Sequence, residues 1–115
     1  MLINGINYRT VWMQDSSVYM INQLLLPFKF EIYRSKNHNE TADAIKTMIV
    51  RGAPAIGATG AYGLSQAALQ YEGSDFNDFK KYIDESFRLL NSARPTANDL
   101  NYALDFVKSK MFVEN

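Results

Sequence analysis

The run from Arg51 to Gly57 carries the clearest chemical signal in the sequence. Arg51 and Gly52 stand just before Pro54, which fits the first position of a helix. The first backbone N–H groups of a helix lack intrahelical partners, and the helix dipole favours negative charge there. The Arg51 guanidinium adds a planar fork of donors that matches a phosphate group, and Gly52 lets the backbone approach a ligand. The run therefore predicts a seat for an anion such as a phosphate ester, with an Arg51–carboxylate pair as the alternative.

A second arginine repeats this arrangement further along the chain. Arg94 precedes Pro95 and Thr96, and Thr96 with Asp99 has the spacing of a helix-capping box. Two arginines at two helix starts could converge on one anion from two directions. The alternative for Arg94 is a salt bridge that connects two helices, because exposed ion pairs are common.

The sequence offers binding groups and no evident catalytic pair. It has no Cys, so a thiolate nucleophile or thiolate metal site within this chain is excluded. The single His38 stands in a polar run, where we expect it to be exposed, and one His cannot build a His-based metal site. We predict neither a metal site nor a cofactor site.

The composition is that of a globular domain. The chain has 115 residues, of which 47% are hydrophobic and 21% charged, and twelve Lys and Arg balance twelve Asp and Glu. A zero net charge argues against nucleic acid or an anionic membrane as a partner, while a local basic site stays open. The longest stretch without charges, residues 52–71, is rich in Gly and Ala, so we expect a buried helix, no membrane span and a cytoplasmic protein.

The residues that could bind an anion require a scaffold, and the patterning predicts an α+β domain over residues 1–115. Residues 1–35 predict a small antiparallel β meander, with a hairpin turn at Asn4-Gly5 and Trp12 and Tyr19 as cross-strand partners. Alternating apolar residues from Phe28 to Tyr33 predict a further strand.

A four-helix unit is predicted to follow. Asn37, Pro54, Ser74 and Thr96 mark the expected helix starts, and Pro54 opens a helix that runs to about residue 70. Glycine lowers the stability of a helix relative to alanine, so several glycines in one helix need an explanation. We expect that a neighbouring helix or the substrate approaches this helix closely at its glycines, which are Gly57, Gly60 and Gly63.

Residues 45–57 and 93–100 closely resemble the N-terminal domain of the methylthioribose-1-phosphate isomerase family, and the similarity extends through Asn22-Gln23 over nearly the whole chain. The Arg-Gly-Ala-Pro-Ala-Ile-Gly run is specific, because the related ribose-1,5-bisphosphate isomerases and initiation-factor regulatory subunits usually differ there. The resemblance implies an aldose–ketose isomerase of methionine salvage that converts 5-methylthioribose 1-phosphate to 5-methylthioribulose 1-phosphate. Family substrate-binding positions carry over to Arg51, Gly52, Ala53 and Arg94.

The resemblance also implies that the catalytic groups lie outside this chain. The family's catalytic Cys and Asp belong to a Rossmann-like C-terminal domain, so we expect a fragment, a separately encoded half or a domain without catalysis, inactive by itself. Its expected partners are a sugar phosphate and that C-terminal half, with a homo-oligomer left open. The alternative function is a non-catalytic regulatory or assembly module of the initiation-factor branch.

Overall fold

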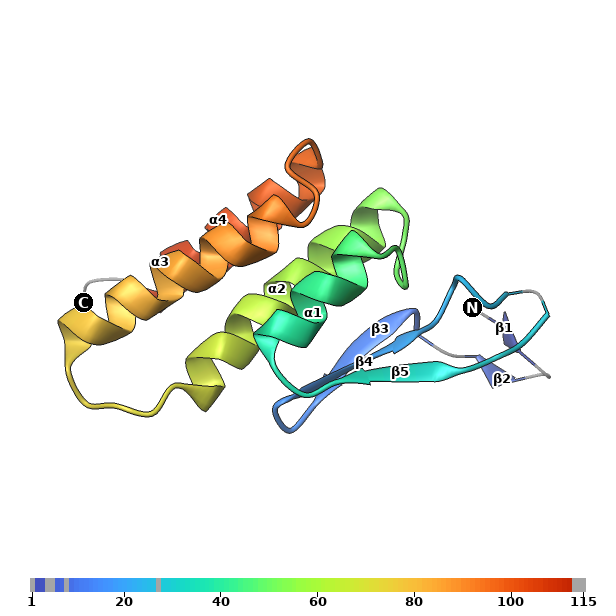
Figure 1. The fold of residues 1–115 in the computed structure, drawn as a ribbon, viewed down its shortest axis with the longest axis horizontal. Helices are drawn as coiled ribbons and strands as arrows, with labels where there is room; N and C mark the ends of the chain where they lie inside the picture. The colour runs from blue at the N-terminus through green and yellow to red at the C-terminus, as the bar shows by residue number, and fades with distance from the viewer. Residues whose placement is uncertain (1, 4–5, 8, 27, 113–115) are drawn as a thin grey trace.

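The computed structural model of the chain describes residues 2–3, 6–7, 9–26 and 28–112. Strands come first and helices follow, which confirms the predicted α+β class (Figure 1). The predicted turn at Asn4-Gly5 lies outside the described residues, although the short strands on either side of it pair antiparallel. The elements are β1 (Leu2–Ile3), β2 (Ile6–Asn7), β3 (Val11–Gln14), β4 (Ser17–Ile21), β5 (Ile32–Ser35), α1 (His38–Lys46), α2 (Ala53–Gln70), α3 (Phe76–Ser92) and α4 (Asn98–Met111).

Strands β3, β4 and β5 form an antiparallel meander. Asp15 adopts a φ of 56° at the tight turn between β3 and β4, a left-handed conformation that Asp tolerates. Trp12 lies directly opposite Tyr19, and their rings stack with centroids 5.7 Å apart. The predicted cross-strand aromatic pair is confirmed.

Strand β5 begins at Ile32, so the predicted strand from Phe28 to Tyr33 is wrong over most of its length. The Lys29 N–H donates to the Leu25 carbonyl, which places the start of this segment in a turn, and only the Glu31 carbonyl, which accepts from the Asn22 N–H, leads into the pairing of β5. Phe28, expected to be half-buried, is 96% exposed. The alternation of apolar and polar residues that begins at Phe28 therefore does not place Phe28 on a buried face of the sheet.

The predicted cap of α1 is confirmed. The Asn37 side chain accepts from the Glu40 N–H at 2.9 Å, as an N-cap residue does. In a capping box the Glu40 side chain would accept from the N–H of Asn37. Here Glu40 Oε1 accepts instead from the N–H of Lys36 at 2.9 Å, one residue before the cap. The reciprocal arrangement is therefore a capping box displaced by one position.

The other helix starts differ from the prediction by one residue. Asp75, and not Ser74, caps α3, where a carboxylate also interacts favourably with the helix dipole. The Ala97 N–H donates to the Arg94 carbonyl, so a separate turn precedes α4, and Ala97 replaces Thr96 as its N-cap. Pro54 is the second residue of α2, not the first, and α2 ends at Gln70 as predicted.

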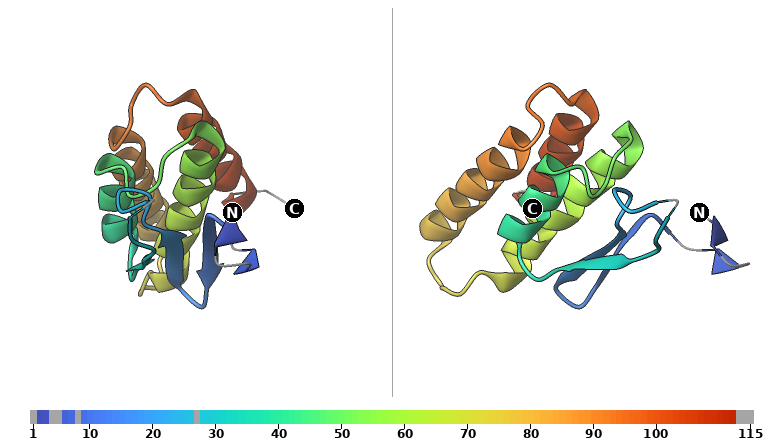
Figure 2. Two further views of the ribbon diagram at one scale, coloured as in Figure 1. Left: turned by 90° about the vertical axis from the view of Figure 1, so that its right-hand side faces the viewer. Right: turned by 45° about the vertical axis from the view of Figure 1, so that its right-hand side comes forward.

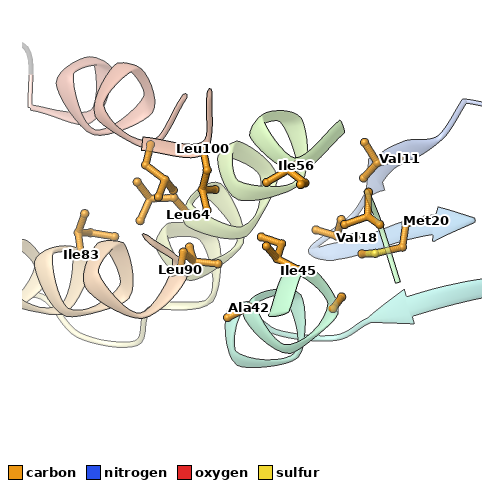
Figure 3. Packing of buried hydrophobic residues seen from close by; sticks show 14 residues of the cluster. Val11, Val18, Met20, Ala42, Ile45, Ile56, Leu64, Ile83, Leu90 and Leu100 are labelled. Atoms are coloured by element: carbon orange, nitrogen blue, oxygen red, sulfur yellow. The ribbon is translucent and has the colours of Figure 1, made fainter. Parts of the chain in front are cut away.

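Helix α2 is the centre of the fold. It contacts the other three helices and strands β3 and β4, within a molecule measuring 47 × 29 × 24 Å (Figure 2). Ile56 packs toward Val11 and Val18 of the sheet, while Leu64 packs toward Leu100 of α4 (Figure 3). Apolar side chains on both sides of α2 therefore build one continuous core.

Candidate functional site

The candidate site begins in the loop that joins α1 to α2. Helix α1 ends in a Schellman motif, in which the Ile49 N–H donates to the Ala44 carbonyl at 3.0 Å and the Met48 N–H to the Ile45 carbonyl at 3.2 Å. Met48 occupies the left-handed position, with a φ of 66°, that glycine usually takes in this motif. Val50 is fully buried and anchors the loop, and Arg51 follows it onto the surface.

Gly52 forms the start of α2. Its φ of 92° with ψ of 133° is a conformation that L-amino acids rarely adopt, although a Cβ there would meet open space. No side chain caps this helix and its first turn has no acidic residue. Pro54 has no N–H, so the amides of Ala53 and Ala55 are the first-turn donors left for a ligand. This helix start can accept an anion.

An open hollow of about 510 Å³ lies in front of this helix start. Hydrogen bonds from Ile21 N–H to the Thr10 carbonyl (3.0 Å) and from Gln23 N–H to the Ile49 carbonyl (2.8 Å) hold its walls together. The sheet, the segment after β4 and the start of α2 each contribute lining residues, which are Arg9, Thr10, Val11, Gln23, Arg51, Gly52, Pro54 and Ala55.

The charged side chains that line this hollow are positive among the described residues. Arg9 and Arg51 are both exposed, and the described lining residues include no Asp or Glu. The ion pairs found within the described ranges lie elsewhere and join Lys29 to Glu31 and Lys108 to Asp84. The alternative in which Arg51 forms a carboxylate ion pair therefore finds no support in the described part of the chain.

Sequence reasoning missed Arg9. Nothing in its neighbourhood distinguishes it, since it stands in no helix-start pattern and belongs to the segment that leads into β3. Only the packing of β3 against α2 brings Arg9 to the same hollow as Arg51.

Arg94 and Ala53 do not line the hollow. Arg94 is half-buried in the turn before α4 and has no carboxylate within 4.0 Å among the residues that the structure describes. The starts of α2 and α4 nevertheless lie side by side (Figures 1 and 2), and a Cβ on Gly57 would approach the Asp99 carbonyl oxygen to 3.1 Å. The starts of the two helices thus lie close together, whereas convergence of Arg94 on the ligand of Arg51 stays a prediction.

Neither a cluster of metal ligands nor a membrane-spanning helix is found among the described residues. No group of three or more His, Cys, Asp or Glu that could hold a metal is present among them. In the same ranges, no helix has both the length and the apolar content needed to cross a membrane.

His38 is buried, and the expectation that it is exposed is wrong. It is 8% exposed and lies edge-on to Tyr82, with centroids 5.7 Å apart. The Ser86 hydroxyl donates to the Tyr82 carbonyl at 2.9 Å, so His38 Nε2–H is the donor to Ser86 Oγ at 3.3 Å. The polar residues around His38 in the sequence did not indicate its burial, because the residues that cover it belong to α3.

Burial lowers the pKa of His38 below its usual value, and a pH dependence of stability follows. The unfolded chain, with a His pKa of about 6.5, binds this proton more readily than the folded chain does. The free energy of unfolding should therefore fall as the pH drops below that value and level off below the folded pKa. Urea denaturation of the wild type and His38→Gln from pH 7.5 to 5 tests this, since the variant should lose less stability. Equal losses would contradict the assignment.

The comparisons with known proteins agree with this fold. Residues 49–115 match the Initiation factor 2 subunit family, and the chain belongs to that family. A 5-deoxyribose 1-phosphate isomerase from Clostridium botulinum is 45% identical over 91 residues, 79% of this chain and 26% of its own length. The structure of 5-methylthioribose 1-phosphate isomerase from Pyrococcus horikoshii OT3 has a TM-score of 0.87, at 39% identity over 93% of this chain and 31% of its own.

A structure named as an initiation factor subunit is nearly as similar. Subunit delta of the translation initiation factor eIF-2B from A. fulgidus has a TM-score of 0.85, at 35% identity over 95% of this chain and 32% of its own. The chain thus spans about a quarter to a third of the length of these relatives.

Proposed function

We propose that the chain is the N-terminal domain of a sugar-phosphate aldose–ketose isomerase. In this proposal residues 1–115 contribute phosphate and sugar contacts, and a Rossmann-like domain outside this chain supplies the proton transfer between C1 and C2. The substrate is 5-methylthioribose 1-phosphate and the product 5-methylthioribulose 1-phosphate, in methionine salvage. The substrate-binding residues are Arg51, Gly52, Ala53 and Arg94.

The observation that carries the proposal is the hollow at the start of α2, whose described charged residues are both arginines. The Arg51 guanidinium, a glycine with a φ of 92° and an uncapped helix start face a space of about 510 Å³. Phosphate esters bind where charge-assisted donors and free backbone amides meet. Relatives named as isomerases of sugar 1-phosphates give the reaction class.

A chimera tests this function. This chain would replace the corresponding first third of the Pyrococcus horikoshii isomerase, and conversion of 5-methylthioribose 1-phosphate would be followed by NMR. The chimera should be active, and Arg51→Ala should lower kcat/KM about 10- to 100-fold, the value of one or two charge-assisted hydrogen bonds. Arg88, exposed on α3, is the matched control, and Arg88→Ala should leave kcat/KM unchanged. A chimera that turns over equally well with Arg51→Ala would overturn the role of Arg51.

A second function deserves a test because of the eIF-2B subunit delta structure, which is similar over 95% of this chain. In that case the chain is a regulatory or assembly module. It would then be indifferent to sugar phosphates, and it would co-purify with a partner protein lacking isomerase activity. A cytoplasmic location, a separately encoded C-terminal half and a homo-oligomer remain predictions from the sequence.

A further inference from the structure

The backbone that follows Arg9 is held by the sheet. The Thr10 carbonyl accepts from the Ile21 N–H at 3.0 Å, and Val11 is 8% exposed and pairs with Met20 in the sheet. Since β3 packs on α2, the backbone at Arg9 has a defined position relative to the start of that helix. The hollow thus has an arginine on its sheet side as well as one on its helix side.

The charges of this hollow match a doubly charged ligand. Among the described residues that line it, Arg9 and Arg51 carry guanidinium groups, and the other polar side chains, Thr10 and Gln23, are neutral. Two like charges that face one space repel each other, so the arrangement is stabilised when an anion enters. A phosphate monoester carries a charge of roughly −1.5 to −2 at pH 7, which one arginine alone leaves partly unneutralised.

We propose that Arg9 is a second binding residue for the phosphate group that Arg51 holds. The inference rests on the proposed function and extends it, because it names a ligand residue on the sheet as well as those on the helix. The ligand class is a phosphate monoester of a small sugar. Arg9 approaches the ester from the sheet side of the hollow, while Arg51 and the amides at the start of α2 approach it from the helix side.

Binding of ribose 1-phosphate to the full 115-residue chain tests this proposal. Chemical shifts in NMR titrations give Kd for the wild type, Arg9→Ala, Arg9→Lys and Arg51→Ala, with Arg88→Ala as the control that removes the same charge elsewhere. Uncharged ribose serves as the second ligand. Arg9→Ala should raise Kd for ribose 1-phosphate at least about tenfold, the value of one charge-assisted hydrogen bond. Arg9→Lys should give a smaller increase, since it keeps the charge and loses the planar fork.

The outcomes separate the two proposals. If Arg51→Ala weakens binding while Arg9→Ala behaves like Arg88→Ala, Arg9 is not a ligand residue and the proposed function stands. If the wild type and Arg51→Ala are alike toward ribose 1-phosphate, the anion site itself fails, and the role of Arg9 fails with it. Because Arg9 is exposed, urea denaturation should find all variants as stable as the wild type.

Discussion

Gln66→Leu is expected to lower the free energy of unfolding by about 3–5 kcal/mol, because it removes three hydrogen bonds from a buried polar network. Gln66 is fully buried, one turn before the end of α2. Its Nε2 donates to the carbonyls of Ser16 and Ser35, both at 3.0 Å, and its Oε1 accepts from the Thr41 hydroxyl at 2.6 Å. One side chain therefore joins α2 to the β3–β4 turn, to the end of β5 and to α1.

Gln70, one turn later on the same helix, provides the matched control. Its Nε2 also donates to two carbonyls, those of Ser16 (3.0 Å) and Lys36 (2.6 Å), but the site is partly open to water. Water can replace an exposed donor, so Gln70→Leu should cost no more than about 1 kcal/mol. Urea denaturation of both variants measures the difference, and equal losses would show that the Gln66 network contributes no more than an exposed amide does.

Gly57→Leu is expected to cost about 3 kcal/mol, because it forces α2 and α4 apart. A Cβ at Gly57 would lie 3.1 Å from the Asp99 carbonyl oxygen and 3.7 Å from Ala103 Cβ. A backbone carbonyl in a helix cannot turn aside as the end of a side chain can, so α4 as a whole must shift. The loss should exceed the gain of up to about 1 kcal/mol in helix propensity that any replacement of a helical glycine brings.

Ala61 gives the control for this change. It lies on the same helix, is half-buried and is not part of the core cluster or of the side chains packed on it. Ala61→Leu should change the free energy of unfolding by less than about 1 kcal/mol. A Gly57→Leu protein as stable as the wild type in urea denaturation would mean that the two helix starts are not held together by this close approach.

The fold was predictable where local pattern and tertiary packing agree. The helical period after residue 35 predicted four helices, and the glycines of α2 predicted close packing, which Gly57 and Gly60 make with α4 and Gly63 with α1 and α3. The pattern failed where a local turn competes with it. The Lys29–Leu25 hydrogen bond places Phe28 in a turn, although the alternating sequence there predicted a strand. The Ala97–Arg94 hydrogen bond closes a separate turn, so α4 starts after Thr96.

The candidate site was predictable only in its contiguous part. Arg51 and Gly52 stand next to each other in the chain, so helix-start chemistry indicated them directly. Arg9 reaches the hollow through the packing of β3 on α2, and His38 is covered by Ser86 and Tyr82 of α3. Such contacts between distant segments leave no trace in local patterning.

Backbone amide shifts of the chain on addition of ribose 1-phosphate, compared with ribose, would show whether the start of α2 binds the phosphate group of a sugar phosphate. The largest phosphate-dependent shifts should fall on Arg51, Gly52, Ala53 and Ala55, and ribose alone should produce none there. Shifts confined to the start of α3, where Asp75 already caps the helix, or no phosphate-dependent shift at Gly52 and Ala53, would mean that the start of α2 is not the phosphate site.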